Sequence, residues 1–438
     1  MRIAVIGLGK IGLPLAVQYA VSGAQVTGVD VNPAVVDSVR SGQVPFPGEH
    51  ELPERLGEMV AAGRLGATTD YSEAIPGADA VVVVVPLLVD DRFAPDFGWM
   101  DAATVELAKH LTAGTLISYE TTLPVGTTRT RWRPMIEEHS GLAEGTDFDL
   151  VFSPERVLTG RVFRDLRRYP KLVGALSERG AARAVAFYGE VLTFDERDDL
   201  PRPNGVWDLG SAEAAEFAKL AETTYRDVNI GLANEFARFA DRSGVDIYAV
   251  IDACNSQPYS HIHRPGIAVG GHCIPVYPRL YLHNDPDATV VAAARQANEA
   301  MPEYGCGLLS AAFGGSLAGR TVVVLGASYR GGVKETAVSG VFPLVAGLQR
   351  RGAEVLVHDP LFTDEELRRL GFRPYGPGTT VDAAILQADH AEYREWTSAD
   401  LPGITVLLDG RNVTSAAAWP GVTRLVLGAP FQPGESGT

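Results

Sequence analysis

A glycine-rich turn near the N-terminus has the residue types and spacing of a dinucleotide-binding site. Gly7, Gly9 and Gly12 follow the apolar run Arg2–Ile6 and precede a helical pattern. Such glycines permit a tight turn and let a pyrophosphate approach backbone N–H groups closely. Asp30 ends the next strand-like run, where its carboxylate would accept from a ribose 2′-hydroxyl and repel a 2′-phosphate, which favours NAD over NADP. The alternative is a glycine turn that only packs a helix against a strand.

A second candidate for chemistry is Cys273, which lies in the loop Val269-Gly-Gly-His-Cys-Ile-Pro-Val-Tyr-Pro278. Glycines and prolines shape such a loop, so it would hold a thiolate close to a substrate. The alternative is a small buried hydrophobic residue, the ordinary state of a lone cysteine. That alternative is preferred for Cys254 and Cys306, which lie in helical patterns. Three scattered cysteines without a CxxC pair predict neither a disulfide framework nor a metal site, and they favour a reducing cytoplasm.

The elements that must position the glycine turn form a βαβ unit, with strands at 2–6 and 25–30 around a helix at 13–22. Further strand-like runs occur at residues 80–85, 115–119 and 149–152, and helical segments separate the first three runs. Alternation of this kind predicts a parallel sheet covered by helices on both faces.

A long helical pattern without proline covers residues 211–243 and is expected to link two lobes. The α/β pattern then restarts, with strands expected at 320–326, 353–359, 405–409 and 424–427, a helix at 341–351 and a helix-to-loop segment at 385–390. The predicted fold class is therefore α/β, with two Rossmann-like domains with parallel sheets joined by a long central helix. The expected domains are residues 1–205, 206–310 and 311–438.

The composition of the chain argues against two classes of protein, general nucleic-acid binders and membrane proteins. The chain has 438 residues, 46% hydrophobic, and a formal net charge of −16, which argues against a general nucleic-acid binder. The most apolar run, residues 81–85, is far shorter than the roughly 20 residues of a membrane helix, so no membrane association is expected. Disorder is expected only in the tail, residues 433–438.

The chain resembles the UDP-glucose/GDP-mannose dehydrogenase family over nearly its whole length. The resemblance is carried, in order, by residues 7–12, by Glu120-Thr-Thr-Leu-Pro-Val-Gly126, by Ser153-Pro-Glu-Arg156, by residues 219–235 and by Gly270-Gly-His-Cys273. The form Gly-Gly-His-Cys-Ile-Pro is more similar to the branch that oxidises UDP-N-acetylhexosamines than to the UDP-glucose enzymes.

The resemblance implies a two-step oxidation of a UDP-hexose or UDP-N-acetylhexosamine to the UDP-uronate, with two hydrides passed to NAD. Cys273 would capture the aldehyde as a thiohemiacetal and later form a thioester. Lys219, with Thr223 four residues on, would stabilise the oxyanions, and Glu155 with Thr122 would activate and place water. The alternatives are a solvated helix lysine for Lys219, a loop carboxylate for Glu155 and a helix cap for Thr122.

The resemblance also implies which residues contact ligands and partners. NAD would contact Gly7, Gly9, Lys10, Ile11, Gly12, Asp30, Pro86 and Thr122. The UDP-sugar would contact Glu155, Arg156, Lys219, Tyr259, His261, His263, Arg264, Gly270 and Arg330, although a solvated loop is a fair alternative for 259–264. The three domains would bind NAD, mediate dimerisation and catalysis, and bind the UDP-sugar, in a cytoplasmic homodimer formed through the central helices.

The sequence differs from the family's usual residues at two positions of the predicted catalytic centre. Thr223 stands where the family usually has asparagine, and Tyr277 where it usually has aspartate. Other departures concern ligand contacts and lie at Leu87, Leu88, Ile267, Ala268 and Ala337. Two alternatives therefore stay open: a one-step, two-electron dehydrogenase that yields an aldehyde or keto sugar, and a nucleotide-sugar-binding relative without turnover.

Overall fold

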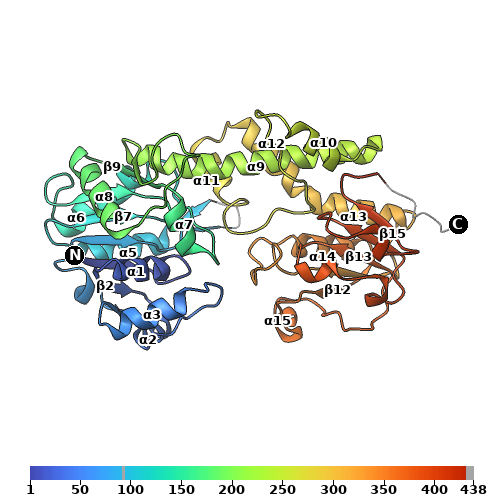
Figure 1. Cartoon of the computed structure of the whole chain (residues 1–438), viewed down its shortest axis with the longest axis horizontal. Coiled ribbons are helices and arrows are strands. Elements are labelled where there is room, and N and C mark those ends of the chain that lie inside the picture. The colour runs from blue at the N-terminus through green and yellow to red at the C-terminus, as the bar shows by residue number, and fades with distance from the viewer. Residues whose placement is uncertain (91–93, 431–438) are drawn as a thin grey trace. The chain divides into compact units, whose positions relative to one another are not determined.

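The computed structural model describes residues 1–90 and 94–430, which form two compact units (Figure 1). Unit 1 comprises Met1–Glu222 and Arg279–Asn284, and unit 2 comprises Thr223–Pro278 and the chain from Asp285 onward. The tail at 433–438, for which disorder is expected, lies outside the described residues.

Unit 1 is built on an eight-stranded sheet of order β10-β9-β8-β7-β4-β1-β2-β3. The strands β3, β2, β1, β4, β7 and β8 are parallel, whereas β9 is antiparallel to β8 and parallel to β10. The predicted parallel sheet is thus confirmed, and two reversed strands, β9 and β10, extend it at one end. The strand bounds are β1 Arg2–Ile6, β2 Gln25–Val29, β3 Leu65–Thr68, β4 Ala80–Val83, β7 Leu116–Tyr119, β8 Asp149–Phe152, β9 Lys171–Ala175 and β10 Val206–Asp208.

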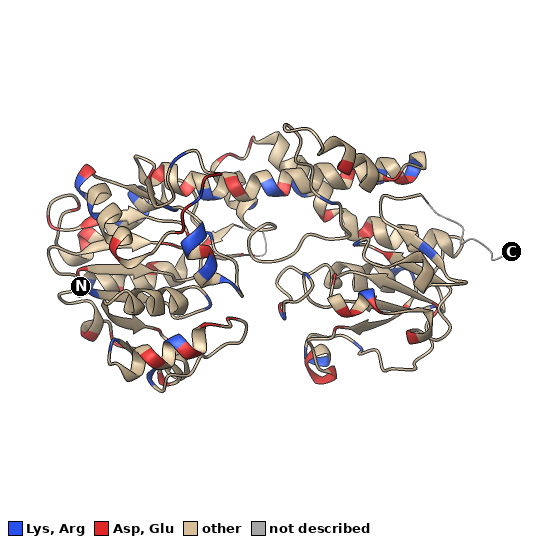
Figure 2. Cartoon of the chain, viewed as in Figure 1, with Lys and Arg blue, Asp and Glu red and all other residues tan. Residues whose placement is uncertain are grey.

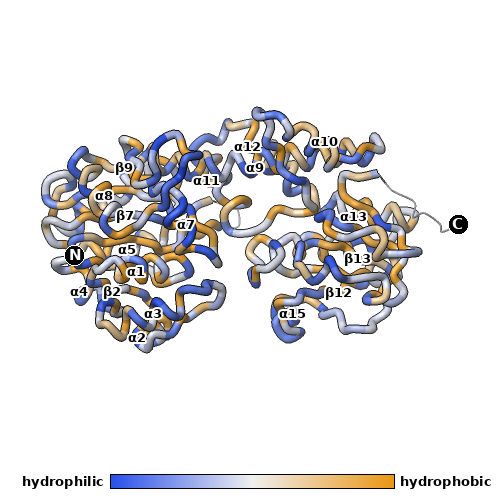
Figure 3. Tube along the Cα trace, viewed as in Figure 1, coloured by the Kyte–Doolittle hydropathy of each residue, from blue (hydrophilic) through white to orange (hydrophobic). Residues whose placement is uncertain are grey.

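Helices cover both faces of this sheet. Ile3 and Val5 of β1 belong to one buried cluster and Ala4 and Ile6 to the other, because successive side chains of a strand point to opposite faces. The strands of both units appear largely orange in Figure 3. The helices are α1 Gly12–Val21, α2 Pro33–Arg40, α3 Leu52–Ala61, α4 Tyr71–Ala74, α5 Gly98–Lys109, α6 Arg133–Ser140, α7 Val162–Arg168 and α8 Glu178–Val191, with a short π-helix at Thr128–Trp132. Two short strands, β5 Leu88–Val89 and β6 Pro95–Asp96, pair antiparallel.

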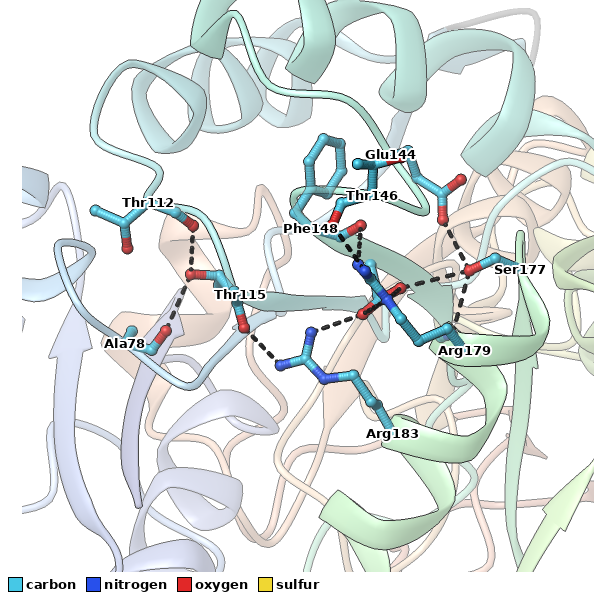
Figure 4. Close-up of polar contacts among 12 residues, drawn as sticks. Ala78, Thr112, Thr115, Glu144, Thr146, Phe148, Ser177, Arg179 and Arg183 are labelled. Carbon is cyan, nitrogen blue, oxygen red and sulfur yellow. Dashed lines mark hydrogen bonds and ion pairs between the residues drawn. The ribbon is translucent and has the colours of Figure 1, made fainter.

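A buried acidic residue, Asp149, ties the amino ends of β7 and β8 to α8, whose Arg179 and Arg183 are labelled in Figure 4. Its fully buried carboxylate accepts from Arg179 Nε at 2.9 Å and from Arg183 Nη1 at 2.6 Å. Arg183 also donates to the carbonyl of Gly114 at 2.6 Å. The last of these bonds satisfies one backbone carbonyl at the amino end of the sheet. The opposite, carboxyl end carries the candidate site.

One helix, α9 (Ala212–Ser243), begins in unit 1 and continues into unit 2, as the proline-free pattern predicts. The chain re-enters unit 1 at α11 (Tyr277–Asn284), whose last residues pack there. Asn284 accepts from the Val125 N–H at 2.8 Å and donates to the Val125 carbonyl at 3.1 Å, and Tyr281 stacks on Phe217.

Unit 2 contains a five-stranded, fully parallel sheet of order β12-β11-β13-β14-β15. The expectation of a helix-to-loop segment at 385–390 is wrong, because Ile385 and Leu386 end the central strand β13 and are fully buried. A strand buried on both faces loses the period-two alternation, so its short apolar run resembles a helix segment. The strands are β11 Thr321–Leu325, β12 Glu354–His358, β13 Ala383–Leu386, β14 Val406–Asp409 and β15 Thr423–Val426.

Both faces of the sheet of unit 2 are buried, one mainly by α-helices and the other by loops and short 3-10 helices. Val322 and Val324 of β11 belong to one cluster, and Val323 and Leu325 to the other. In Figure 2, residues of both charge signs are scattered over each unit. In the described chain, 1–90 and 94–430, no helix is both apolar and long enough to span a bilayer. The helices are α10 Ile247–Cys254, α12 Thr289–Glu299, α13 Met301–Ala312, α14 Val341–Arg350 and α15 Asp364–Arg369, with 3-10 turns at Ala391–Arg394, Ser398–Asp400 and Ala416–Ala418.

Candidate active site

The glycine turn of unit 1 has the geometry that a dinucleotide requires. Gly7 has φ +93°, and a Cβ on Gly12 would lie 1.8 Å from the Gly7 carbonyl oxygen, so both positions require glycine. A Cβ on Gly9 would meet nothing within 4 Å, which leaves that side of the turn open to a ligand. Asp30 accepts from the Leu8 N–H at 2.9 Å, so its carboxylate is held against the turn, where a ribose hydroxyl would lie.

The turn lies at the topological switch point of the sheet. β1 pairs with β2 on one side and with β4 on the other, so the segments after β1 and β4 diverge at the carboxyl edge. The predicted cofactor contacts Lys10 and Ile11 precede α1, and Pro86 follows β4 with an exposed side chain. The residues present therefore fit a bound NAD.

Three of the predicted catalytic residues belong to unit 1. Thr122 follows β7 and Glu155 follows β8, and because these strands are parallel neighbours both residues leave the same carboxyl edge. Lys219 lies on α9 with 9% of its surface exposed, so it is not the solvated helix lysine of the alternative interpretation. Its positive charge contributes to the low pKa of Glu155.

The Glu155 carboxylate is fixed by bonds to both oxygens. Oε1 accepts from the backbone N–H groups of Arg156 at 2.6 Å and Val157 at 3.1 Å, and Oε2 accepts from Lys171 Nζ at 3.0 Å. Burial alone would raise the pKa of Glu155, but Lys171 and the Arg156 N–H hold that pKa below its usual range. The Arg156 guanidinium pairs with Glu222 of α9 at 2.9 Å.

Sequence reasoning assigned no role to Lys171 or to Glu120, although both are buried beside Glu155. Lys171 Nζ donates to Glu120 Oε2 at 2.6 Å, and Glu120 Oε1 accepts from Tyr188 at 2.7 Å and Tyr19 at 3.2 Å. A lysine at the head of the apolar run Lys171–Ala175 was the only sign in the sequence that this charge is buried.

A second buried acid connects α9 to the loop that follows Thr122. Glu216 is fully buried and accepts from the N–H groups of Gly126 at 2.5 Å and Thr128 at 2.9 Å. Burial raises the pKa of Glu216 to about 7, against the opposing effect of these hydrogen bonds. Glu216 precedes Lys219 by one helical turn, so it fixes the loop to the segment of α9 that carries the lysine.

Cys273 belongs to unit 2 and has an exposed side chain. The loop before it is tightly packed, since a Cβ on Gly270 would lie 2.8 Å from the Val338 carbonyl oxygen and Gly271 has φ +95°. The Cys273 carbonyl accepts from the N–H of Tyr277, the first residue of α11, at 2.9 Å. The thiol is therefore presented on a rigid turn.

A buried ion pair supports the other side of this turn. Arg295 of α12 pairs with Asp227 of α9 at 2.7 Å, and the same guanidinium nitrogen donates to the Ile274 carbonyl at 3.3 Å. Asn298 adds a bond to Asp227 at 2.7 Å. No motif or periodicity in the sequence indicates this network.

The predicted substrate loop, residues 259–264, is held by Asn229 of α9, which donates to the His261 carbonyl at 2.8 Å and accepts from the His263 N–H at 3.0 Å. The Arg264 guanidinium pairs with Asp252, and Tyr259 is 93% exposed. Burial, followed by the Arg226 charge, lowers the pKa of His263.

Two predicted residues of unit 2 remain. Arg330 is exposed, and its Nε donates to the hydroxyl of its neighbour Tyr329 at 3.2 Å. Thr223 is buried on α9, four residues beyond Lys219 and hence on the same helical face. The predicted site residues are thus divided between the two units.

Comparison with known proteins identifies the family to which the chain belongs. The family models match residues 1–192 with the NAD binding domain, 213–300 with the central domain and 323–416 with the UDP binding domain of the UDP-glucose/GDP-mannose dehydrogenase family. The chain is 36% identical to a UDP-N-acetyl-D-mannosamine dehydrogenase of Pyrococcus horikoshii, covering 94% of this chain and 96% of the relative. It is 30% identical to an NDP-N-acetyl-D-galactosaminuronic acid dehydrogenase of Ralstonia nicotianae, with coverage of 94% and 96%.

Among solved structures, a UDP-D-ManNAc dehydrogenase from Pyrococcus horikoshii superposes with a TM-score of 0.86 at 32% identity, covering 98% of this chain and 99% of that one. The glycine turn lies in the part that the NAD binding domain model matches, and the buried lysine of α9 and the exposed cysteine lie in the part that the central domain model matches. The chain belongs to the UDP-glucose/GDP-mannose dehydrogenase family of NAD-dependent oxidoreductases.

Proposed function

We propose that this chain is a UDP-N-acetylhexosamine 6-dehydrogenase that uses Cys273 as a covalent nucleophile. The observation that carries the proposal is the exposure of Cys273 on a rigid glycine turn, because Cys306 is buried and Cys254 lies within an ordinary helix. The relatives named above support the choice of an N-acetylated sugar, and UDP-N-acetyl-D-mannosamine is the proposed substrate.

The proposed reaction converts the sugar C6 alcohol, two NAD⁺ and one water into a carboxylate, two NADH and three protons. Bound NAD supplies the hydride acceptor. The Cys273 thiolate adds to the C6 aldehyde to form a thiohemiacetal, which becomes a thioester when its C–H bond is lost as hydride. Water then cleaves the carbon–sulfur bond and returns the thiol.

Residues of α9 and of the carboxyl edge of the first sheet would assist these steps. The Lys219 ammonium, largely removed from solvent, would stabilise the alkoxide and the tetrahedral oxyanions, with Thr223 as a further donor. Glu155 would accept a proton from the hydrolytic water that Thr122 helps to place. The family usually has other residues at the positions of Thr223 and Tyr277. The experiment below therefore measures the second oxidation and the hydrolysis directly.

The proposed binding site of the UDP moiety belongs to one of the two units. We propose that the UDP moiety binds to unit 2, whose C-terminal part matches the UDP binding domain. Arg330, Gly270 and the loop 259–264 are its proposed contacts. The functional division into residues 1–205, 206–310 and 311–438 is proposed on the same basis.

We also propose a cytoplasmic homodimer that forms through α9. Four large apolar side chains are exposed on one helical face of α9, at Tyr225, Leu232, Phe236 and Phe239. Their spacing of seven, four and three residues gives a continuous stripe, and such stripes mark interfaces. Light scattering on a size-exclusion column tests the state, and Phe239→Glu is expected to give monomers.

The experiment that tests the reaction is the NADH yield per limiting UDP-N-acetyl-D-mannosamine, with the product mass determined. Two NADH and a uronate mass are expected, and Cys273→Ser should abolish uronate while NAD binding persists. One NADH per sugar and an aldehyde or keto product would instead indicate a two-electron enzyme. UDP-glucose and UDP-N-acetyl-D-galactosamine serve as comparison substrates, and binding without NADH from any of the three would indicate a relative without turnover.

A further inference from the structure

A buried row of charges connects Glu155 to the interior of unit 1. Lys171 Nζ lies between Glu155 Oε2 at 3.0 Å and Glu120 Oε2 at 2.6 Å. The side chains of Lys171 and Glu120 are 4% and 0% exposed, and that of Glu155 is 10% exposed. Three ionisable groups therefore share one interior site, and the outermost of them is the carboxylate proposed to activate water.

Glu120 is the inner anchor of this row. Its second oxygen accepts from the hydroxyls of Tyr188 and Tyr19, and the Lys171 ammonium also lies 4.9 Å from the centre of the Tyr188 ring. Glu120 directly follows β7, and the two tyrosines belong to α8 and α1, so the carboxylate that holds the lysine is itself fixed by two helices. A lysine ammonium that is held in this way also fixes the position of an acceptor on the side opposite Glu120.

Glu155 is the group on that side. Backbone N–H groups hold its Oε1, and Lys171 is the only side chain of the described residues with a hydrogen bond to its Oε2. The backbone bonds come from the two residues that directly follow Glu155, so they would persist if the lysine were replaced. The charge balance would not persist, because two carboxylates would then share one buried site without the cation between them.

We propose that Lys171 is a positioning residue for Glu155, which it keeps ionised and correctly oriented, so that Lys171 sets the acid limit of the hydrolytic step. The inference deepens the proposed function, since it rests on the role given there to Glu155. It assigns a purpose to a buried lysine that lies outside the motifs of the predicted site.

The electrostatics of the cluster agree with this geometry. Burial would lower the pKa of Lys171, but Glu120 and Glu155 together raise it. Burial keeps the pKa of Glu120 above its ordinary value despite the lysine, whereas Lys171 and the Arg156 N–H hold the pKa of Glu155 below its own. Lys219 of α9 and the Tyr19 hydroxyl also interact electrostatically with Glu155.

The test is the pH dependence of uronate formation from UDP-N-acetyl-D-mannosamine by the full-length enzyme with saturating NAD. Glu155 must be ionised to accept a proton, so the rate falls as the pH drops through its pKa. In Lys171→Met the acid limb should move up by about one pH unit or more, with kcat reduced more than KM changes. Lys171→Arg, which retains the charge, should return the limb toward that of the wild type.

Two further variants keep the result interpretable. Lys109→Met removes a surface lysine of α5 that pairs with Glu106 in the i,i+3 position, and it should leave the profile unchanged. Glu120→Gln with Lys171→Met removes the inner pair together and protects folding, yet Glu155 still loses its cation, so the limb should still move up. An acid limb that stays at the wild-type position both in Lys171→Met and in Glu120→Gln with Lys171→Met overturns the inference.

The inference and the function on which it rests fail in different ways. If Glu155→Gln forms uronate at the wild-type rate, the base assignment of the proposed function is wrong. If Glu155→Gln is inactive in hydrolysis while Lys171→Met keeps the wild-type profile, only the role of Lys171 is wrong.

Discussion

Arg295 donates a hydrogen bond to the carbonyl oxygen of Ile274, the residue that directly follows Cys273, at 3.3 Å. The same guanidinium forms the buried ion pair with Asp227. Support for the cysteine turn therefore originates in α9 and α12, far from it in sequence. This arrangement leads to the first of four predictions.

Arg295→Met should both destabilise the protein and slow the reaction. Removing one partner of a buried ion pair costs about 3–5 kcal/mol, and a displaced nucleophile can cost on the order of 10²-fold in rate. Urea unfolding and NADH formation measure the two effects. Asp227→Asn with Arg295→Met should recover part of the stability but not the rate; recovery of both would show that the arginine only stabilises the fold.

The stability of unit 1 should depend on pH through Glu216. Its folded pKa of about 7 lies above its ordinary value of 4.5, so its protonated form favours the folded state. That stability is fully present below pH 4.5 and is lost as the pH rises through 7. Relative to Glu216→Gln, the wild type should lose about 1–3 kcal/mol between pH 5 and pH 8.

Urea unfolding at pH 5, 6, 7 and 8 measures this difference. Glu213→Gln is a useful comparison, because Glu213 is half-buried and its pKa is lowered by Arg129. A constant difference between wild type and Glu216→Gln over this range would contradict the prediction.

Two glycines of the cofactor turn should respond differently to alanine. A Cβ on Gly12 would collide with the Gly7 carbonyl, so Gly12→Ala should destabilise unit 1 whether or not NAD is present. Gly9→Ala meets no protein atom within 4 Å, so it should keep the wild-type melting temperature and weaken NAD binding. Calorimetric titration with NAD and thermal melts of both variants separate the two effects, and equal losses of stability would count against this geometry.

The three cysteines should react at different rates with iodoacetamide. Cys273 is exposed, whereas burial raises the pKa of the Cys306 thiol to about 11. Peptide mass spectrometry at pH 8 should find Cys273 alkylated first and Cys306 alkylated only after unfolding. Prior labelling of Cys306 in the native protein would contradict the described packing.

Local patterns in the sequence are sufficient for much of this fold. The βαβ turn is encoded by Gly7, whose φ of +93° favours glycine, and by Gly12, where a Cβ would collide with the Gly7 carbonyl. The helix α9 is encoded by 32 residues without proline. By contrast, β13 was misassigned because a strand buried on both faces has no alternation. The reversed strand β9 was missed because its direction depends on its pairing with β8.

The same distinction applies to the candidate site. Cys273 and Lys219 lie in sequence motifs of a few consecutive residues. The proposed role of Lys171 instead depends on its contacts with Glu155 and Glu120, which lie 16 and 51 positions away in the sequence. The pair of Arg295 with Asp227 spans 68 positions. Propensity and periodicity describe neighbours along the chain, so they cannot reveal which distant charges are buried together.

The return of residues 279–284 to unit 1 limits how the protein can be divided. A polypeptide that stops at residue 222 would lack the Asn284 side chain that bonds to Val125 and the Tyr281 ring that stacks on Phe217. A gene fragment encoding the NAD-binding half alone should therefore yield an incompletely packed product. Recombination between related genes would transfer that half intact only if codons 279–284 were inherited with it.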